Sequence, residues 1–409
     1  MTATTGHVVI VGAGLSGLST AEALRAGAHP GPITLIGGEA DLPYDRPPLS
    51  KEVLRGERQS TALRMADWFA EQGITLLTGT TVAGIDPDSG TVDLPGRRLT
   101  ADMIVLATGG TPRRLPGGVN TLPTGHPALH ELRTVADCRR LTDALRPGTK
   151  LAVIGAGLIG AEAAASAVAR GCHVDLIDPN ELPLAAAIGP EAATLLHRRH
   201  AAHGVTTHQA GVEHIHAADN DTVRIVLSTG DTIAADALLV GIGITADTAL
   251  AEAAGLAVDN GILVDSRQRT SHPRVMAVGD ASRRHGPDGP LPRVEHWDHA
   301  LRSGQTAAAT ILDTPEQPPR APWFWSDRYD IHLEMVGHLD PRAQSAIRLH
   351  TDDELSIFYL RDGRCIGAVT VNQPLDARAA QRLIDQHIPV TADQLTDPAV
   401  SLRQLVRGR

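Results

Sequence analysis

The sequence predicts an α/β fold with parallel sheets, made of two Rossmann-like domains and a small C-terminal α+β domain. Three observations carry this prediction. An apolar strand, a glycine-rich turn and an alanine-rich helix follow one another twice, at residues 7–27 and 150–171. Further strand-length apolar runs alternate with helical stretches, as in parallel sheets. The tail reads instead as short strands closed by one helix, at 332–336, 356–359, 365–370 and 377–386.

Composition places the chain among soluble globular enzymes. Hydrophobic residues make up 42% and charged residues 21% of the 409 residues, which is ordinary for that class. The net charge of −10 argues against nucleic-acid binding, which needs a basic surface. The apolar runs are too short for a membrane span, and the N-terminus lacks the pattern of a secretory signal. We therefore expect a cytoplasmic protein with no nucleic-acid or membrane partner.

The first glycine turn has a physical reason for each glycine. Residues 7–11 form an apolar run, and Gly12, Gly14 and Gly17 follow at the spacing GxGxxG. The first glycine permits a tight turn, the second lets the backbone approach a pyrophosphate, and the third lets the helix pack on the strand. The helix N-terminus offers free N–H groups to phosphates. Glu39 follows the next apolar strand.

The pattern recurs after a strand at residues 150–154, with Gly155, Gly157 and Gly160. Asp178 closes the next strand, where a carboxylate can accept hydrogen bonds from an adenine ribose. This carboxylate would repel a 2′-phosphate, so the sequence favours NADH over NADPH. One such turn could belong to another α/β protein, but two complete copies argue against that. Two dinucleotides, one held tightly and one exchanging, point to FAD and a nicotinamide.

Two further segments fit the same scheme. Residues 102–110 read as a buried strand ending in a glycine turn, which indicates a backbone that approaches a ligand closely. Residues 275–281 read as another strand that ends near Asp280. Its carboxylate then lies at the carboxyl end of a strand, where ligands of open α/β sheets bind. A helix N-cap is the alternative for Asp280.

Two short motifs are specific. Residues 43–51 read PYDRPPLSK and residues 322–327 read PWFWSD. With the glycine turns, the ATGG segment at 107–110 and the GD segment at 279–280, they make the chain resemble the FAD-dependent pyridine-nucleotide oxidoreductases of the ferredoxin reductase type. This family includes putidaredoxin reductase and the ferredoxin reductases of ring-hydroxylating dioxygenases. The resemblance extends over essentially the whole chain.

The resemblance implies a function. A hydride passes from NADH to FAD, and single electrons then pass to a separate iron–sulfur ferredoxin that serves a cytochrome P-450 type monooxygenase or a Rieske dioxygenase. A rubredoxin reductase, or an NADH-sensing signalling flavoprotein related to apoptosis-inducing factor, remains an open alternative. We expect a monomer or homodimer. Ferredoxins are typically acidic, so the candidates for a basic contact patch are Arg283, Arg284, Arg293 and Arg302, although a solvated charged face is equally consistent with each.

The resemblance also implies cofactor-binding positions. For FAD these are Gly12, Gly14, Ser16, Gly17, Glu39, Arg46, Lys51, Val82 in a strand at 80–82, Ala107, Thr108, Gly109, Arg133, Asp280 and Trp297. For the second dinucleotide they are Gly155, Gly157, Leu158, Ile159, Gly160, Glu162 and Asp178, with Gly243 as a further cofactor-binding position. Val82 is expected to contact the adenine, Asp280 the ribityl chain and Trp297 the flavin ring.

Lys51, Glu162 and Trp325 are the implied catalytic residues. In the family the lysine and the glutamate pair near the hydride-accepting edge of the flavin, where they could position the nicotinamide. The alternatives are a phosphate-binding or surface lysine and an exposed glutamate in the first helical turn. Trp325 is expected to shield the flavin and Trp323 to lie on the exit side for electrons. Core packing is the alternative for both tryptophans.

The chain departs from the family at two places. Gly38 stands where many relatives have an acidic residue, so the ribose contact there falls to Glu39 or is lost. No arginine occurs in the segment 180–188 after Asp178. This leaves the strength of NADH binding open, while the preference for NADH over NADPH stands.

Several chemistries are excluded by what the sequence lacks. No cysteine precedes Cys138, and disulfide reductases of this fold need a thiolate near the first dinucleotide turn. His200 and His203 lie one helical turn apart without an acidic third ligand, so we expect a solvated helix face and no metal site. The expected domains are FAD at 1–112 and 242–320, NADH at 113–241 and α+β at 321–409.

Overall fold

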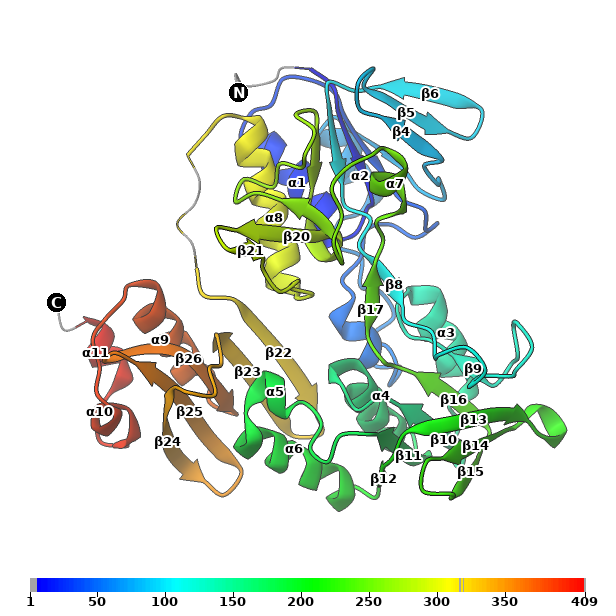
Figure 1. The fold of residues 1–409 in the computed structure, drawn as a ribbon, viewed down its shortest axis with the longest axis vertical. Coiled ribbons are helices and arrows are strands. Elements are labelled where there is room, and N and C mark those ends of the chain that lie inside the picture. The colour runs from blue at the N-terminus through cyan, green and yellow to red at the C-terminus, as the bar shows by residue number, and fades with distance from the viewer. Residues whose placement is uncertain (1–5, 316–317, 319, 408–409) are drawn as a thin grey trace. The chain divides into compact units, whose positions relative to one another are not determined.

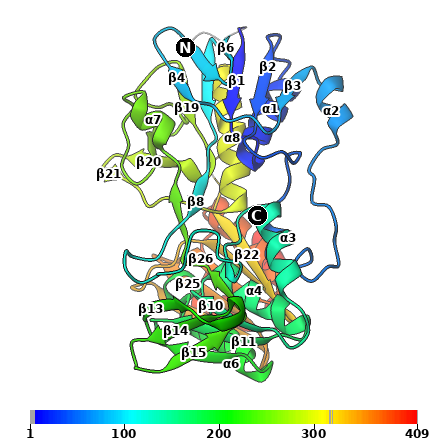
Figure 2. The same ribbon diagram turned by 90° about the vertical axis from the view of Figure 1, so that its right-hand side faces the viewer.

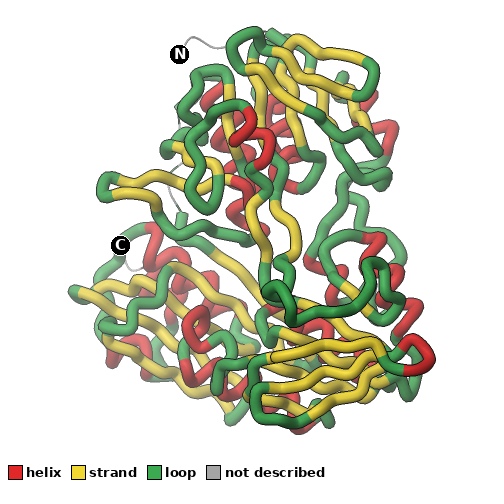
Figure 3. Tube along the Cα trace, turned by 45° about the vertical axis from the view of Figure 1, so that its right-hand side comes forward, coloured by secondary structure: helices red, strands yellow, loops and turns green. Residues whose placement is uncertain are grey.

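The computed structural model describes residues 6–315, 318 and 320–407. These residues form two compact units (Figures 1 and 2). Unit 1 comprises residues 1–46, 60–111 and 244–318, and unit 2 comprises 47–59, 112–243 and 319–409. Both units contain helices and strands (Figure 3). Within the described ranges, no helix is long and apolar enough to cross a lipid bilayer.

A five-stranded parallel sheet forms the centre of unit 1. Its strands are β1 (Val8–Val11), β2 (Ile33–Ile36), β3 (Ile74–Leu77), β7 (Met103–Leu106) and β19 (Val275–Ala277). Their order is β19-β7-β1-β2-β3, with every neighbouring pair parallel. Four of the strands are buried along their whole length, because a parallel sheet is covered on both faces.

Helices cover one face of this sheet, and small strands and a short helix cover the other. On one side, α1 (Leu15–Ala26) and α8 (Trp297–Ile311) pack closely together (Figure 1). A Cβ at Gly304 of α8 would lie 2.5 Å from the Ser16 carbonyl oxygen, so this approach requires glycine. α2 (Ala66–Glu71) joins the same core through Phe69. The other face and edges carry β4 (Gly84–Asp86), β5 (Thr91–Leu94), β6 (Arg97–Thr100), α7 (Ala249–Ala253), β18 (Ile262–Val264), η3 (Gly279–Ala281), β20 (Ser282–Gly286) and β21 (Gly289–Pro290).

Unit 2 contains a second mostly buried parallel sheet with the order β12-β11-β10-β16-β9. Its strands are β9 (Leu129–His130), β10 (Lys150–Ile154), β11 (His173–Asp178), β12 (Thr206–Gln209) and β16 (Ala237–Val240). Its other elements are η1 (Pro47–Ser50), α3 (Val135–Ala144), α4 (Leu158–Ala169), α5 (Ala185–Ile188), α6 (Pro190–Ala202), β13 (Val212–Ala217), η2 (Asp219–Asp221), β14 (Val223–Leu227) and β15 (Thr232–Ala235).

The C-terminal part of unit 2 is an antiparallel sheet with helices on one face. Its elements are β22 (Trp323–Arg328), β23 (Ile331–Gly337), β24 (Gln344–Thr351), β25 (Glu354–Arg361), β26 (Arg364–Val371), α9 (Pro374–Asp385), α10 (Ala392–Thr396) and α11 (Leu402–Arg407). The predicted strands and closing helix are present, but the prediction missed β22 and β24, the two edge strands of the order β22-β23-β26-β25-β24. The opposite sheet face shares a hydrophobic core with α5 and α6.

The chain leaves unit 1 after Thr111 and returns to it at Ile244. Two short paired strands, β8 (Gly110–Pro112) and β17 (Ile244–Ala246), mark these crossings. Unit 2 holds both the segment 112–243 and the C-terminal segment from 319. The assignment of separate FAD, NADH and α+β domains therefore stays a prediction.

Candidate active site

The first glycine turn, in unit 1, requires glycine at two positions and leaves open space at the third. Gly12 has a φ of +112°, and a Cβ there would lie 2.0 Å from the Ala107 carbonyl oxygen. A Cβ at Gly17 would lie 1.9 Å from the Gly12 carbonyl oxygen. A Cβ at Gly14 would meet no atom of the described chain within 4 Å. The turn is therefore tight at Gly12 and Gly17, and it leaves open space beside the Cα of Gly14.

The second glycine turn, in unit 2, repeats this geometry. Gly155 has a φ of +98°, and its Cβ would lie 2.5 Å from the Gly241 carbonyl oxygen. A Cβ at Gly160 would lie 1.9 Å from the Gly155 carbonyl oxygen, while a Cβ at Gly157 would meet no described atom within 4 Å. Leu158 and Ile159 open α4, and Ile159 is 43% exposed.

Both helices that follow these turns begin with a glycine N-cap and, in the described chain, no side-chain cap. The first N–H groups of a helix lack partners within the helix and carry partial positive charge. Open space above the second glycine and uncapped N–H groups form a cradle for an anion. Both turns therefore fit the pyrophosphate of a dinucleotide.

The GD segment lies against the first turn within unit 1. A Cβ at Gly279 would lie 2.5 Å from the Ser16 hydroxyl oxygen, and the Gly279 N–H donates to Ser303 Oγ at 2.9 Å. Asp280 follows Gly279 within η3. The predicted position of Asp280 at the end of a strand is correct, and the residue belongs to a single 3₁₀ turn.

The ATGG segment contributes backbone to the same turn. The Ala107 N–H donates to the Val11 carbonyl oxygen at 2.7 Å, and Thr108 Oγ1 donates to the Asp247 carbonyl oxygen at 2.6 Å. Gly109 has a φ of +72°. The sequence predicted that the backbone of this segment approaches another group closely, and in the structure that group is the first glycine turn.

Glu39 is held by two neighbours within unit 1. Tyr44 Oη donates to Glu39 Oε2 at 2.6 Å, and Arg46 Nη2 lies 3.0 Å from Oε1. The Arg46 guanidinium also lies over the Tyr44 ring, 5.4 Å from its centroid. Val82 is buried in the core, but it lies outside any strand, so the strand predicted at 80–82 is wrong. The chain pairs in strand geometry only from Gly84 onward.

Trp297 is the first residue of α8. Its Nε1 donates to Asp45 Oδ1 at 2.8 Å, which connects α8 to the PYDRPPLSK segment. Burial lowers the pKa of His296, just before the helix, and of His299 in its first turn. The lowered pKa favours neutral rings at the N-terminal end of α8, where the partial positive charge of the helix acts together with the nearby carboxylates of Asp280 and Asp298.

Glu162 is the meeting point of three sequence motifs in unit 2. Lys51 Nζ lies 2.8 Å from Glu162 Oε2, with the side chains only 5% and 2% exposed. Ser50 Oγ donates to Oε2 at 2.5 Å, and Ser326 Oγ donates to Oε1 at 2.7 Å. The pairing of Lys51 with Glu162 is present, and the alternative of an exposed glutamate is wrong. The two serines belong to the recognised motifs, but no sequence signal marked them as partners.

A second buried cation lies beside this carboxylate. Arg328 is 4% exposed, and its Nε donates to Ser326 Oγ at 3.3 Å. Burial lowers the pKa of Arg328 to about 10, while the charge of Glu162 acts in the opposite direction. Lys51 Nζ also donates to the Pro47 carbonyl oxygen at 3.1 Å. The carboxylate is thus compensated by hydroxyl donors and by positive charge, as a buried charge requires.

The two tryptophans of PWFWSD stack on each other. The rings of Trp323 and Trp325 have centroids 4.8 Å apart at an interplanar angle of 21°. Trp323 Nε1 donates to Glu334 Oε1 at 2.9 Å. His332 is hydrogen-bonded to Asp327 at 2.6 Å and lies 3.6 Å from the carboxylate of Glu334, and these two carboxylates raise its pKa to about 9.

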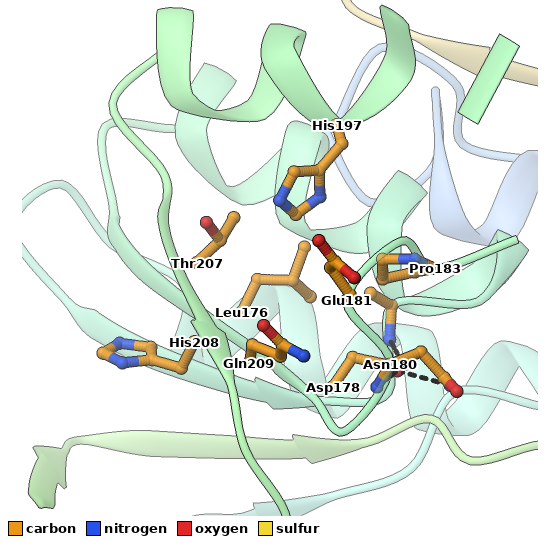
Figure 4. Close-up of a pocket in the computed structure, with 10 residues that line it drawn as sticks. Leu176, Asp178, Asn180, Glu181, Pro183, His197, Thr207, His208 and Gln209 are labelled. Atoms are coloured by element: carbon orange, nitrogen blue, oxygen red, sulfur yellow. Dashed lines mark hydrogen bonds between the residues drawn. The ribbon is translucent and has the colours of Figure 1, made fainter. Parts of the chain in front are cut away.

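Asp178 borders a pocket of about 140 Å³ in unit 2 (Figure 4). Its Oδ2 accepts from the Ala156 N–H of the second glycine turn at 2.9 Å. Its Oδ1 accepts from the backbone and side-chain nitrogens of Asn180 at 2.9 and 2.8 Å. The pocket thus lies at the carboxyl ends of parallel strands beside the second turn, where a nucleotide binds in such a sheet.

Two further predicted positions lie outside the glycine turns. Arg133 uses its backbone N–H to donate to Asp137 Oδ2 at 3.1 Å, just before α3. Gly243 has a φ of +96° and stands at the crossing between the units. These contacts are explained by the local backbone alone, so the cofactor roles of both residues stay predictions.

Two expectations about charged and histidine side chains are wrong. His200 is 2% exposed, its Nδ1 lies 2.8 Å from Tyr329 Oη, and burial lowers its pKa to about 3. It is a neutral core residue, because the C-terminal sheet covers this face of α6.

Within the described chain no three histidine, cysteine or acidic residues are grouped to hold a metal ion. Arg293 has a side chain only 4% exposed and paired with Glu295 at 2.6 Å, so it cannot serve a contact patch.

The other three arginines proposed for a basic contact patch differ in whether an acidic side chain already pairs with them. Arg283 and Arg302 are paired with Asp259 at 2.8 Å and Asp298 at 2.7 Å. Arg284 is exposed on β20. A basic contact patch at these positions stays a prediction that depends mainly on Arg284.

Comparison with known proteins covers almost the whole chain. A family model described as pyridine nucleotide-disulphide oxidoreductase matches residues 6–304, and a reductase C-terminal model matches residues 323–406. Rhodocoxin reductase of Rhodococcus erythropolis is 36% identical over 403 residues, 97% of this chain and 93% of that protein. The anthranilate 1,2-dioxygenase system ferredoxin–NAD(+) reductase component of Burkholderia cepacia is 38% identical over 402 residues, 97% of this chain and 98% of that protein.

A solved structure gives the same result for the fold. The crystal structure of the covalent putidaredoxin reductase–putidaredoxin complex matches with a TM-score of 0.93 and 35% identity over 98% of each chain. The predicted fold class and the predicted family are both confirmed. The chain belongs to the pyridine nucleotide-disulphide oxidoreductase family.

Proposed function

We propose that this chain is an FAD-containing NADH:ferredoxin oxidoreductase. It takes a hydride from NADH and passes single electrons to a separate iron–sulfur ferredoxin. The observation that carries the proposal is that Lys51 and Ser50 of the segment 43–51 and Ser326 of the segment 322–327 all contact the carboxylate of Glu162, in the helix after the second glycine turn. Relatives named as ferredoxin–NAD(+) reductase components that align over nearly their full length support it.

The residues of this chain would hold the cofactors as follows. The turn at Gly12, Gly14 and Gly17 would bind the FAD pyrophosphate, with Asp280 beside it, and the turn at Gly155, Gly157 and Gly160 would bind that of NADH. The helix that follows each turn has no side-chain cap within the described chain, so its N-terminus would be open to the phosphates. Bound FAD supplies the conversion of one hydride into two single-electron steps.

The buried network orients Lys51. Glu162 and the Pro47 carbonyl oxygen together fix its ammonium group, and the serine hydroxyls fix Glu162 in turn. We assign Lys51 the role of presenting one fixed positive charge to the reacting cofactors, with Glu162 as the residue that keeps it in place. Trp325, stacked on Trp323, is assigned the role of excluding water from the flavin.

Thiol chemistry does not fit these residues. All three cysteines are free and buried. Burial raises the pKa of Cys138 and Cys172, and it raises the pKa of Cys365 to about 12. A thiol with a raised pKa is a poor nucleophile at neutral pH. The electrons therefore leave through a partner protein and not through a disulfide of this chain.

The ferredoxin is proposed to serve an oxygenase, of either the cytochrome P-450 or the Rieske type, in the cytoplasm. Support comes from the names of relatives, which include a dioxygenase system and a ferredoxin reductase for a CYP199A2 system.

Anaerobic mixing tests the proposal. NADH should bleach the flavin of the purified protein quickly, NADPH should do so poorly, and added oxidised ferredoxin should restore the yellow colour. Rubredoxin is the matched alternative acceptor. A protein without flavin, or a reduced flavin that no iron–sulfur carrier reoxidises, would overturn the assignment; reoxidation by rubredoxin alone would replace ferredoxin as the partner.

A further inference from the structure

The pocket beside Asp178 presents a second carboxylate. Its lining comes from the second glycine turn, the ends of β11 and β12, the loop after β11 and α6, and it includes Ala156, Asp178, Asn180, Glu181, His197 and His208. Glu181 is exposed, and among the described residues none donates a hydrogen bond to its carboxylate. Figure 4 shows this carboxylate pointing toward the ring of His197 across the pocket.

Asp178 has little capacity left for a ligand. A carboxylate offers about four lone-pair sites, and three donors from Ala156 and Asn180 already bind those of Asp178. A ribose presents two hydroxyl donors. One of them can reach Asp178, and the other needs a second acceptor. Glu181 is the lining carboxylate that still has its acceptor sites open.

Two histidines line the pocket, and they differ in whether they can offset the negative charge of Asp178 and Glu181. His208 Nε2 lies 2.7 Å from Asp175 Oδ1, so His208 is committed to a carboxylate of its own. His197 stands on α6 facing Glu181 (Figure 4). A ligand phosphate, with its charge near −2, would therefore meet two carboxylates and one uncommitted imidazole.

We propose that Glu181 is a second specificity-determining carboxylate, which accepts a ribose hydroxyl of NADH and excludes a 2′-phosphate together with Asp178. This inference rests on the proposed function. It implies that removing the charge of Asp178 alone leaves the pocket closed to a 2′-phosphate, and that both carboxylates must be neutralised before such a ligand binds well.

The test uses the FAD-loaded full chain and two ligands that do not react, ADP-ribose and 2′-phospho-ADP-ribose, with binding measured by calorimetry. The quantity compared is the dissociation constant of 2′-phospho-ADP-ribose divided by that of ADP-ribose. Asp178→Asn and Glu181→Gln should each lower this ratio by about threefold to tenfold, and the double variant by roughly the product, because exposed charge interactions are of this size. The effect of Glu181→Gln should shrink at high salt.

Glu213→Gln, which removes an exposed carboxylate on β13 outside the pocket, is the matched control and should leave the ratio unchanged. If Glu181→Gln changes the ratio no more than this control, or if Asp178→Asn alone gives tight binding of the 2′-phosphorylated ligand, the inference about Glu181 is overturned. If the unsubstituted protein binds neither ligand, the proposed NADH-dependent function fails first, so the two failures are distinguishable.

Discussion

Ser326 Oγ donates a hydrogen bond to Glu162 Oε1 at 2.7 Å, although the two residues are 164 positions apart in the sequence. This contact joins β22 of the C-terminal sheet to α4, the helix that follows the second glycine turn. Ser50 Oγ donates to the other oxygen of the same carboxylate. The side chain that orients Lys51 is therefore fixed by two segments of unit 2 that are remote in sequence.

Ser326→Ala should destabilise the protein by about 1–3 kcal/mol, because it leaves a buried carboxylate oxygen without its donor. The free energy of unfolding from urea denaturation of the FAD-loaded protein measures this. Ser345→Ala, at an exposed position of β24 in the same sheet, is the control and should change stability by less than about 0.5 kcal/mol. Equal effects of the two substitutions would contradict the importance of the Ser326 contact.

Lys51 and Glu162 should behave as a coupled pair. Lys51→Met leaves a buried carboxylate without its cation and should cost about 3–5 kcal/mol of folding free energy. In a Glu162→Gln background the amide oxygen can accept from one serine and the amide N–H can donate to the hydroxyl oxygen of the other. The same substitution should cost less there by roughly 1–3 kcal/mol. A double-mutant cycle on urea unfolding measures this coupling, and strictly additive effects would show that the ion pair contributes nothing of its own.

The sequence predicted the elements that local patterns determine. Both glycine turns were predictable because their spacing and flanking strands permit one backbone path, and Asp178 because it ends the next strand. The partners of Glu162 were not predictable, since Ser50 and Ser326 reach it only through tertiary packing across separations of 112 and 164 residues.

The errors have physical causes of the same kind. His200 was expected on a solvated helix face because no acidic third ligand accompanies it and His203, but the C-terminal sheet covers that face of α6 and Tyr329 contacts the ring. Strand β22 was read as a motif and not as a strand, although its side chains alternate between buried and half-buried along WFWSDR. The sequence does not show this alternation, because two of the three buried positions hold the polar residues Ser326 and Arg328, so no apolar period-2 pattern marked the strand.

His332 should make stability depend on pH. The hydrogen bond to Asp327 and the nearby carboxylate of Glu334 raise its folded-state pKa to about 9 from 6.5, so protonation favours the folded state. This contribution is fully present below about pH 6.5 and is lost as the pH rises through about 9. The side chain is 40% exposed, so screening limits the effect to about 1 kcal/mol. The difference in unfolding free energy between the unsubstituted protein and His332→Gln should shrink from pH 6 to pH 10.

Gly14 and Gly17 should respond oppositely to alanine. A Cβ at Gly14 meets no described atom within 4 Å, and its backbone, at φ −72° and ψ −175°, is open to any residue. Gly14→Ala should therefore fold, with unchanged far-UV circular dichroism, but the methyl group fills the pyrophosphate space. We expect the purified protein to carry much less flavin, measured as the ratio of flavin to protein absorbance.

Gly17→Ala should instead fold poorly, because its Cβ would lie 1.9 Å from the Gly12 carbonyl oxygen and something in the turn must shift. Gly157→Ala, the same change in the second turn, is the matched control. It should keep the flavin and lose affinity for ADP-ribose, since the open space there belongs to the other dinucleotide. A Gly14→Ala protein that retains full flavin would show that the pyrophosphate does not lie above the first turn.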